Sequence, residues 1–350
     1  MIEPLLTQRH LDRALLARQL LLERSQGGIP EALEQVGGLQ TQYAPSGYVG
    51  LWTRMAGFER ADLTRALEER SVIQATLMRG TIHLVSAREY WLFAMGIRRA
   101  RREWQLRLER NDHSAGRAQR HDEDLRRALS DGPRTVAELG GLASGFVGNV
   151  GLWVDLVRVP PSGTWERRRA DTLALAEDWV GPCEVTEEQG LDHLVRSYLR
   201  GFGPAPLRDI SSWAGVPVRP LKSAAERLGL RRLRDESGRE LLDVAGAPLP
   251  DPDTPAPVRF LPHWDANLLV HARRTGLVPE PYRPLIFTTK NPFSVGVFLV
   301  DGIVAGAWSV RDGHVRVEPY EDLSSAVRRE VDAEAARLDA FHRGDGRSEG

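Results

Sequence analysis

The feature that most constrains the fold is a series of short helices followed by a two-stranded hairpin, clearest in residues 183–250. Thr186 is a good N-cap, and the strand-like runs are separated by a turn at 235–238. The predicted elements are helices at 190–200, 207–213 and 218–228 and strands at 230–234 and 239–244. This order predicts a winged-helix unit, and the arginines of the hairpin suit a wing that contacts DNA.

The same order occurs twice upstream, in units that we place at residues 1–118 and 119–182. In the first unit, Thr7 begins a helix that we expect to stop at Gly27 and Gly28. Its other predicted elements are helices at 29–36, 48–55 and 61–69 and strands at 72–77 and 81–85. The second unit has predicted helices at 122–129, 135–139 and 149–156, a strand at 157–159 and a return strand at Trp165.

A Pro- and Asp-rich segment at 248–257 is followed by a different, β-rich composition. The strand-like runs lie at 258–261, 285–289, 295–300, 303–309 and 314–318. Short strands with tight turns indicate a barrel or sandwich, which we take as a small β-barrel over 251–320. A helix at 323–340 follows within the C-terminal segment 321–350. The expected fold is α+β, with three tandem winged-helix units followed by a small β-barrel.

The near-zero net charge does not indicate a nucleic-acid partner, but the excess of arginine over lysine favours one. The 350-residue chain has a net charge of -1, and Lys222 and Lys290 are the only lysines among its 47 basic residues. Arginine suits bidentate phosphate contact, although codon bias in a GC-rich genome explains the excess equally well. The helix predicted at 87–110 carries arginines that include Arg98 and Arg102. They form either a track along phosphates or a solvated face over an aromatic core face.

We expect a cytoplasmic protein without metal, cofactor or membrane partner. Cys183 is the only cysteine, and no two of the nine histidines have ligand spacing. The N-terminus lacks the pattern of a signal peptide, and the most apolar run, 293–308, is too short to span a bilayer.

Gln40 and Gln42 stand one residue apart, just after the second predicted helix and before a predicted turn at 44–47. Two neutral amides spaced in this way can converge on one water molecule or one sugar. Idle surface amides are the alternative, because glutamine pairs are common.

Four segments in this order and spacing resemble the AlkZ/YcaQ-type winged-helix DNA glycosylases, from about Leu11 to Glu334. They are the Gln-x-Gln, the strand at 81–86, the stretch at 259–265 and the hairpin at 300–308. The resemblance implies winged helices and a barrel arranged as a C around duplex DNA. It also implies hydrolysis of the N-glycosidic bond of N7-alkylguanine, and unhooking of interstrand crosslinks. Gln40 and Gln42 match the catalytic motif of the AlkZ branch, which is associated with self-resistance in producing organisms.

Amides suit this reaction because N7 alkylation already makes the base a cationic leaving group. The remaining tasks are to hold a water molecule and to place negative dipole ends near the developing oxocarbenium ion. We therefore predict that Gln42 positions the water and that Gln40 helps to align water and deoxyribose. With so few lysines to form a Schiff base, we predict a monofunctional enzyme that leaves an abasic site.

Further residues are predicted to support the site or to contact DNA: Thr81, His83, Trp264, Asp265, Lys290, Asn291, Phe293, Arg98 and Arg102. The turn at 289–293 is predicted to probe a groove, with Phe293 as an apolar wedge. Structural roles remain open for several of them. Thr81 and His83 can be a satisfied pair in the wing, Asp265 can cap a turn, and 289–293 can be a plain barrel turn.

The expected partner is double-stranded DNA carrying alkylated guanine, bound by a monomer. Without the resemblance, the same pattern predicts a non-catalytic transcription regulator with several winged helices, or a scaffold protein. Sequence-specific binding would favour the regulator, and failure to bind DNA at low salt would favour the scaffold.

Overall fold

The computed structural model describes residues 5–109, 114–143, 154–269, 271, 276–287 and 295–344, and these form a mixed helix and sheet fold. Four helices come first: α1 (Gln8–Arg18), α2 (Ile29–Val36), α3 (Ala44–Arg54) and α4 (Arg60–Glu68). Thr7 caps α1 as predicted. The expected stop at Gly27 is wrong, because α1 ends at Arg18 and Leu20 takes a positive φ of 57°.

The segment after the Gln-x-Gln is helical and does not form the predicted turn. Residues 44–47 are the first turn of α3, which therefore begins earlier than the predicted residue 48. Pro45 favours this start, because the first turn of a helix needs no N–H donor and proline presets a helical φ.

A six-stranded sheet joins the first two predicted units. Its strands, in spatial order, are β1 (Leu39–Gln40), β3 (Ile82–Ser86), β2 (Val72–Thr76), β5 (Leu156–Arg158), β6 (Thr172–Leu175) and β4 (Arg134–Thr135). The predicted β2–β3 hairpin is confirmed, with a 3-10 turn at Met78–Gly80 (η1) between its strands. The strand predicted at 157–159 pairs with β2 and β6, so strands from the first two predicted units form one sheet.

The return strand predicted at Trp165 is wrong, because β6 occupies that place in the sheet. Trp165 lies instead in the loop between β5 and β6, and its ring packs edge-on against Tyr48 with 5.6 Å between the centroids. The burial of Trp165 therefore holds a loop against α3 and does not mark a strand.

Helices connect and cover the strands of this sheet. They are α5 (Ala87–Glu109), α6 (Ser114–Ala128), α7 (Val136–Leu139) and α8 (Ala176–Trp179). The predictions for α5 and α7 are confirmed, and α6 begins earlier than the predicted residue 122. For the helix predicted at 149–156, residues 149–153 lie outside the described ranges, and Leu156 starts β5.

The elements predicted for residues 183–250 are confirmed. They are α9 (Glu187–Phe202), α10 (Leu207–Ala214), α11 (Val218–Arg227) and the hairpin of β7 (Arg231–Arg234) and β8 (Glu240–Asp243). Helices α5 and α9 approach closely at Gly96 and Gly190. A Cβ atom built on Gly190 would lie 2.3 Å from the backbone nitrogen of Gly96. Larger residues at these two positions would therefore push the helices apart.

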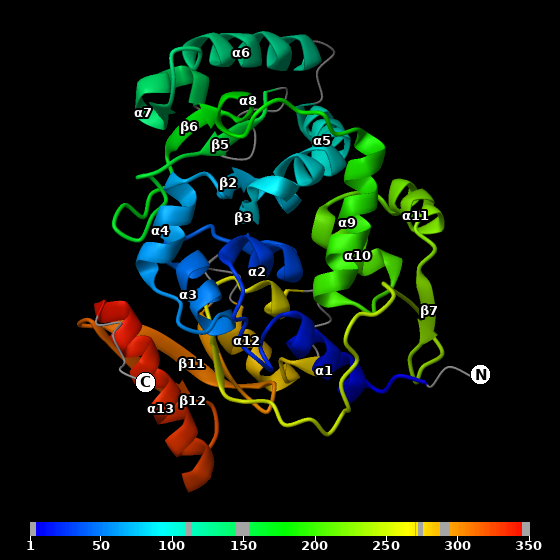
Figure 1. The fold of residues 1–350 in the computed structure, drawn as a ribbon, viewed down its shortest axis with the longest axis vertical. Coiled ribbons are helices and arrows are strands. Elements are labelled where there is room, and N and C mark those ends of the chain that lie inside the picture. Colours follow the sequence, from blue (N-terminus) through cyan, green and yellow to red (C-terminus); the bar gives the residue numbers. More distant parts are fainter. Residues whose placement is uncertain are drawn as a thin grey trace.

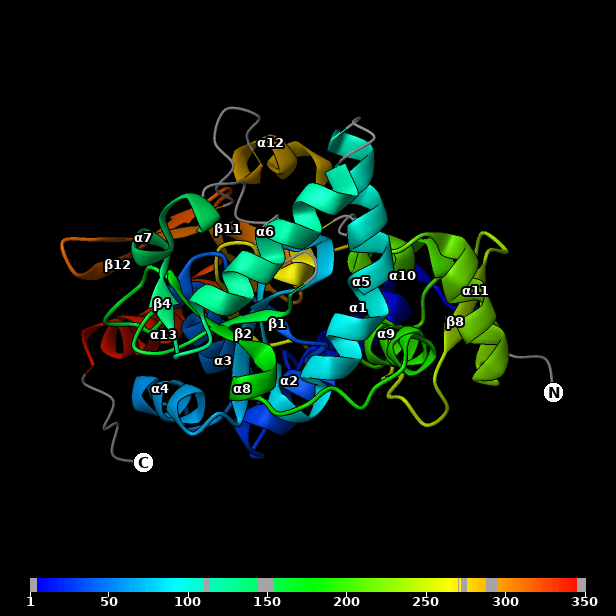
Figure 2. The same cartoon turned by 90° about the horizontal axis from the view of Figure 1, so that it is seen from above.

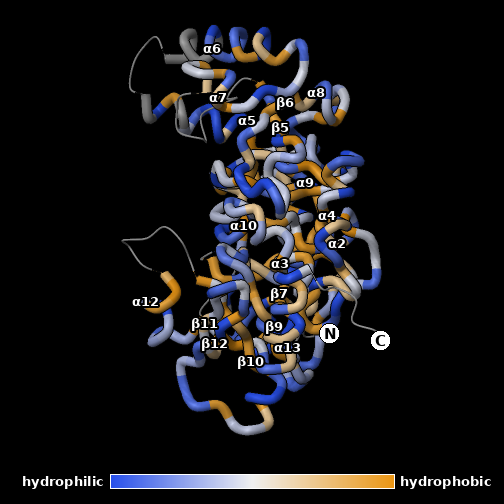
Figure 3. Tube along the Cα trace, turned by 90° about the vertical axis from the view of Figure 1, so that its left-hand side faces the viewer, coloured by the Kyte–Doolittle hydropathy of each residue, from blue (hydrophilic) through white to orange (hydrophobic). Residues whose placement is uncertain are grey.

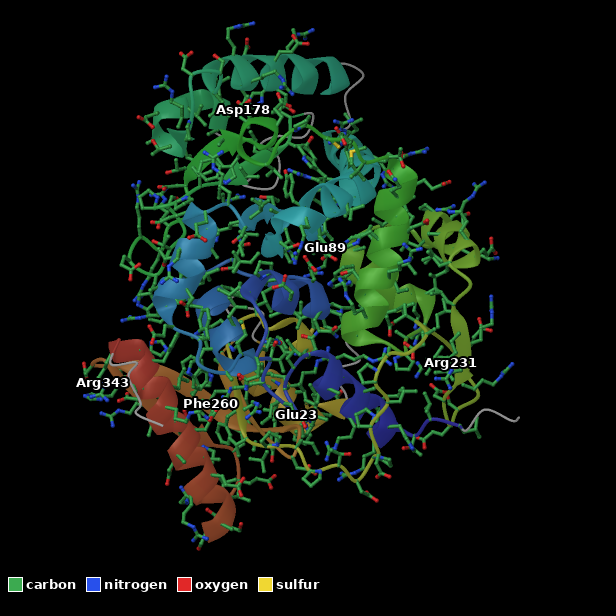
Figure 4. All side chains as sticks on the ribbon, in the orientation of Figure 1. Glu23, Glu89, Asp178, Arg231, Phe260 and Arg343 are labelled. Atoms are coloured by element: carbon green, nitrogen blue, oxygen red, sulfur yellow. The ribbon has the colours of Figure 1, made fainter. Side chains whose placement is uncertain are left out.

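The C-terminal segment forms an open sheet, and a closed barrel is not found in the part of the chain that the structure describes. The sheet order is β12 (His314–Pro319), β11 (Ile303–Arg311), β10 (Gly296–Val300) and β9 (Arg259–Leu261). The strand predicted at 285–289 is wrong at its start, since α12 (Arg283–Ile286) includes Leu285; residues 288 and 289 lie outside the described ranges. Phe260, labelled in Figure 4, stacks on Phe298 between β9 and β10.

The layers are arranged along one long axis. Figure 1 shows α6 and α7 at one end and the C-terminal sheet with α13 (Ser325–Arg343) at the other. In the view from above, α9, α10 and α11 lie on one side of α5, and α13 lies on the other (Figure 2). In Figure 3, the end with α6 and α7 and the end with α12 both project to the same side of the trace.

Buried ion pairs tie the N-terminal helices to distant segments. Arg18 Nη1 donates to Asp243 Oδ1 at 2.6 Å, and Arg54 Nη2 donates to Asp265 Oδ2 at 2.9 Å, with every side chain at most 1% exposed. Removing one partner would leave an uncompensated buried charge, which typically costs about 3–5 kcal/mol. These pairs hold α1 against the β7–β8 hairpin and α3 against the segment after β9.

A buried histidine makes stability depend on pH. Burial lowers the pKa of His193 in α9 to about 3, with a smaller contribution from Arg200 and Arg196. The unfolded chain therefore takes up a proton on this side chain below about pH 6.5, which the folded chain does not. As the pH falls through this range, the folded state loses stability.

We predict that His193→Gln removes this part of the acid sensitivity. The stability of the variant relative to the wild type should improve by up to about 1.4 kcal/mol per pH unit between about pH 6 and pH 4. Urea unfolding at several pH values measures the difference. Parallel stability curves for the two proteins would contradict the assignment.

Candidate functional site

The Gln-x-Gln segment lies at the edge of the six-stranded sheet. Gly37 and Gly38 both take positive φ, 77° and 79°, which turns the chain from α2 into β1. Gln40 then pairs with His83 of β3, and Thr41 N–H donates to the Ile82 carbonyl at 2.8 Å. Thr41 is buried, whereas Gln40 is half-buried and Gln42 is exposed. The two glutamines therefore flank a residue that anchors the segment in the core.

Arg79 holds the amide of Gln40. Its Nη2 donates to Gln40 Oε1 at 2.9 Å, and its Nη1 donates to the Trp213 carbonyl of α10. A guanidinium group only donates, so the amide atom that faces it is the carbonyl oxygen. Burial lowers the pKa of Arg79 to about 10, so that this anchor stays charged at neutral pH.

The backbone of β3 holds the amide of Gln42. Ile82 N–H donates to Gln42 Oε1 at 3.1 Å, which again identifies the oxygen as the fixed atom. A carbonyl oxygen has two lone pairs, so one remains for a second donor such as water. The next residue is fixed as well, since Arg168 Nη1 donates to the Tyr43 hydroxyl at 2.9 Å.

His83 and Thr81 have the contacts of a satisfied structural pair. His83 is 2% exposed, and its Nδ1 lies 2.9 Å from the Thr81 carbonyl, so this nitrogen carries the proton. Burial, reinforced by the charge of Arg79, lowers the pKa of His83 to about 3. The Thr81 hydroxyl donates to the Met78 carbonyl at 3.0 Å. His83 is therefore a buried, neutral side chain on β3, the strand that pairs with the strand of Gln40.

A cavity of about 250 Å³ opens beside Gln42. Its polar lining consists of Gln42, Thr76, Arg101, Arg158, Arg169 and Asp171. Gln40 is not part of this lining, because it pairs with His83 and its amide is directed to Arg79. The structure thus brings one of the two glutamines together with arginines from α5, β5 and the loop that follows β5.

The arginines of α5 have different surroundings. Arg98 Nη2 donates to Asp155 Oδ2 at 2.5 Å, and Arg102 is half-buried, which lowers its pKa. Trp91 and Phe93 are buried, as the alternative of an aromatic core face requires, whereas Trp104 of the same helix is 55% exposed. Arg101 is the arginine of this helix that lines the cavity, and no local pattern distinguishes it from the neighbouring arginines.

The remaining predicted residues lie around the segment after β9 or outside the described ranges. Asp265 is 4% exposed, pairs with Arg54 and caps the turn Ala266–Leu268 by accepting from Asn267 N–H, which supports its structural alternative. Trp264 is half-buried and takes a positive φ of 58°. Lys290, Asn291 and Phe293 lie outside the described residues.

Two other kinds of feature are absent from the residues that the structure describes. No group of three His, Cys, Asp or Glu side chains lies close enough to hold a metal ion in these ranges. In the same ranges, no helix is long and apolar enough to cross a membrane.

The geometry thus places one neutral amide, that of Gln42, at the edge of an arginine-lined cavity. A family model described as DNA glycosylase AlkZ-like matches residues 33–341. The chain belongs to this family of AlkZ-like DNA glycosylases.

Relatives agree with this assignment. A curated protein of Streptomyces sahachiroi, named interstrand DNA cross-link repair glycosylase, is 23% identical over 92% of this chain and 92% of its own length. The solved structure of the Streptomyces sahachiroi DNA glycosylase AlkZ has a TM-score of 0.77 and 18% identity, and the match covers 97% of this chain and 98% of that chain. At this identity, the structural likeness shows that the two proteins share a fold.

We predict that Arg79→Met loosens the site and destabilises the protein. The buried Trp213 carbonyl and the Gln40 carbonyl would each lose a donor, and an unsatisfied buried carbonyl costs about 1–3 kcal/mol. Urea unfolding measures the loss. The control is Arg219→Met on exposed α11, which should change stability by less than about 0.5 kcal/mol. Equal effects of the two substitutions would contradict an anchoring role.

Proposed function

We propose that this protein is a monofunctional DNA glycosylase that hydrolyses the N-glycosidic bond of N7-alkylguanine and unhooks interstrand crosslinks made through such adducts. The observation that carries the proposal is Gln42 at the edge of the arginine-lined cavity, with its carbonyl oriented by Ile82 N–H. The name of the Streptomyces relative, interstrand DNA cross-link repair glycosylase, supports the crosslink substrate. Repair of alkylation, including self-resistance to a genotoxic natural product, is the setting that this substrate implies.

The side of the molecule towards which α6, α7 and α12 project (Figure 3) is the proposed place of the DNA duplex. A duplex there would lie between α6 and α7 at one end and α12 at the other. A crosslinked base cannot leave its partner strand freely, so an open binding face suits it better than a closed base pocket. In the proposed arrangement, the protein is C-shaped and partly encloses the duplex.

The proposed reaction needs no strong acid or base. Water oxygen attacks C1′ as the C1′–N9 bond breaks, its electron pair passes to the cationic base, and the water proton goes to solvent. The free lone pair of Gln42 Oε1 accepts from this water and places a negative dipole end near the oxocarbenium ion. Because an amide does not abstract protons, normal uncharged bases are not substrates.

Gln40 has the role of a positioning residue in this proposal. Its carbonyl already accepts from Arg79, so its amide nitrogen is the end that remains to donate to a sugar or phosphate oxygen. The buried Thr41 between the glutamines fixes the spacing of the two amides. Gln42 thus contacts the water, and Gln40 aligns the nucleotide.

We predict that Gln42→Ala slows formation of abasic sites on N7-methylguanine duplexes by about 10²-fold, since misplacing the water costs about that much. Gln40→Ala should give a smaller loss. Single-turnover rates at saturating enzyme measure both, and duplex affinity should stay unchanged. Gln26→Ala provides the matched control, because Gln26 is exposed in the loop before α2. Wild-type rates in both site variants would refute the assignment.

The absence of covalent catalysis gives a separate prediction. Lys222 lies on α11, 70% exposed, 4.0 Å from Glu226 and away from the cavity lining. We expect borohydride added during turnover to trap no protein–DNA adduct and the product strand to stay intact until alkali is added. A trapped adduct would show a Schiff base and overturn the monofunctional assignment.

A further inference from the structure

A buried arginine without a carboxylate partner lies in the cavity beside Gln42. Arg158 in β5 is 6% exposed. Its Nη1 donates to the Thr76 hydroxyl at 2.7 Å and its Nε donates to the Ala170 carbonyl at 3.2 Å. Both acceptors are neutral, and Arg158 forms no ion pair with any residue of the described ranges. Of the other buried arginines, Arg13, Arg18 and Arg54 are paired with Asp301, Asp243 and Asp265. Arg259 donates to two backbone carbonyls and does not line this cavity.

The surroundings add to this positive charge. Arg101 lines the same cavity and is close enough to repel Arg158 electrostatically. Burial lowers the pKa of Arg158 to about 10, so the group is still charged at neutral pH. The one carboxylate in the lining, Asp171, is already engaged: Arg169 Nε lies 3.1 Å from it, Arg167 Nη2 lies 3.7 Å from it, and the Ser162 hydroxyl donates to it at 3.2 Å.

Burying an unpaired charge costs several kcal/mol, so proteins keep such a group where a ligand completes it. A guanidinium group matches two oxygens of a phosphate with parallel N–H donors. The cavity volume of about 250 Å³ accommodates one phosphate with part of its sugar. Gln42 forms part of the same lining, so a phosphate held there lies beside the proposed water-binding group.

We propose that Arg158, with Arg101 and Arg169, forms a binding site for one backbone phosphate of the DNA strand, next to the nucleotide that Gln42 acts on. The site rests on the proposed function for the identity of that strand. Its ligand is a phosphodiester, recognised by charge and by the paired donors of Arg158. It therefore fixes the position of the strand and does not read its sequence.

The test compares Arg158→Gln with the wild type. Glutamine removes the charge and keeps an amide donor for Thr76 or Ala170. The matched control is Arg328→Gln on exposed α13, which makes the same change of charge at the opposite end of the molecule (Figure 1). Affinity for an undamaged duplex is measured against salt concentration for all three proteins.

The expected result is a loss of affinity of about tenfold or more in Arg158→Gln. The slope of log affinity against log salt should fall by about 0.9, the amount expected for one phosphate contact. Arg328→Gln should keep the wild-type slope. An unchanged slope in Arg158→Gln, or an equal fall in the control, would overturn the site.

A second measurement covers the case in which Arg158→Gln does not fold. Arg169→Gln changes the cavity rim, where the side chain is 81% exposed, and should lower affinity in the same direction but by less. Inorganic phosphate should raise the melting temperature of the wild type more than chloride of equal ionic strength does. If phosphate stabilises the protein but neither variant weakens duplex binding, the site takes a free anion and the proposal fails.

Failure of this site and failure of the glycosylase proposal give different results. Undamaged duplex binding tests the phosphate contact without any reaction. Base release from alkylated duplex by the wild-type protein tests the glycosylase activity without any variant. An active enzyme whose Arg158→Gln variant binds like the wild type refutes only the phosphate site.

Discussion

The pairing of β1 with β3 is the interaction on which the site depends. Two residues of β1 pair with β3, and this register sets Gln40 opposite His83, buries Thr41 and brings Ile82 N–H to Gln42. A slip of one residue would exchange faces, turning Thr41 outward and pressing uncompensated amides into the core. Gly37 and Gly38 allow this register in two ways. Both take a positive φ, and a Cβ atom on Gly38 would lie 3.0 Å from the Leu84 carbonyl.

The second constraint is the pairing of β2 with β5, which merges strands from two predicted units into one sheet. This pairing places Arg158 beside Thr76, and the loop after β5 places Arg169 and Asp171 in the cavity lining. None of these residues is near Gln42 in the sequence. The cavity is thus a product of sheet assembly, and neither unit alone would contain it.

Local signals predicted the helices and hairpins well. The caps at Thr7 and Thr186 and the hairpins of β2–β3 and β7–β8 depend on neighbouring residues, which sequence patterns record. The errors occur where distant contacts decide, as for Trp165, whose ring is fixed by Tyr48, and for the C-terminal strands, whose open sheet was expected to be a barrel. Arg79 and Arg158 were missed because no local pattern in an arginine-rich chain distinguishes them, and their partners Gln40 and Thr76 are distant in the sequence.

The charges of the proposed site can be understood only with DNA in place. The cationic base and the oxocarbenium ion that forms would both be repelled by Arg101 and Arg158 in a low-dielectric cavity. A phosphate bound by these arginines cancels that repulsion, so that the dipole of the Gln42 amide can act on the reacting sugar. Neutral glutamines therefore fit a site whose negative charge is supplied by the substrate itself. In this view the arginines and the glutamines act as one unit, since the first make the second effective.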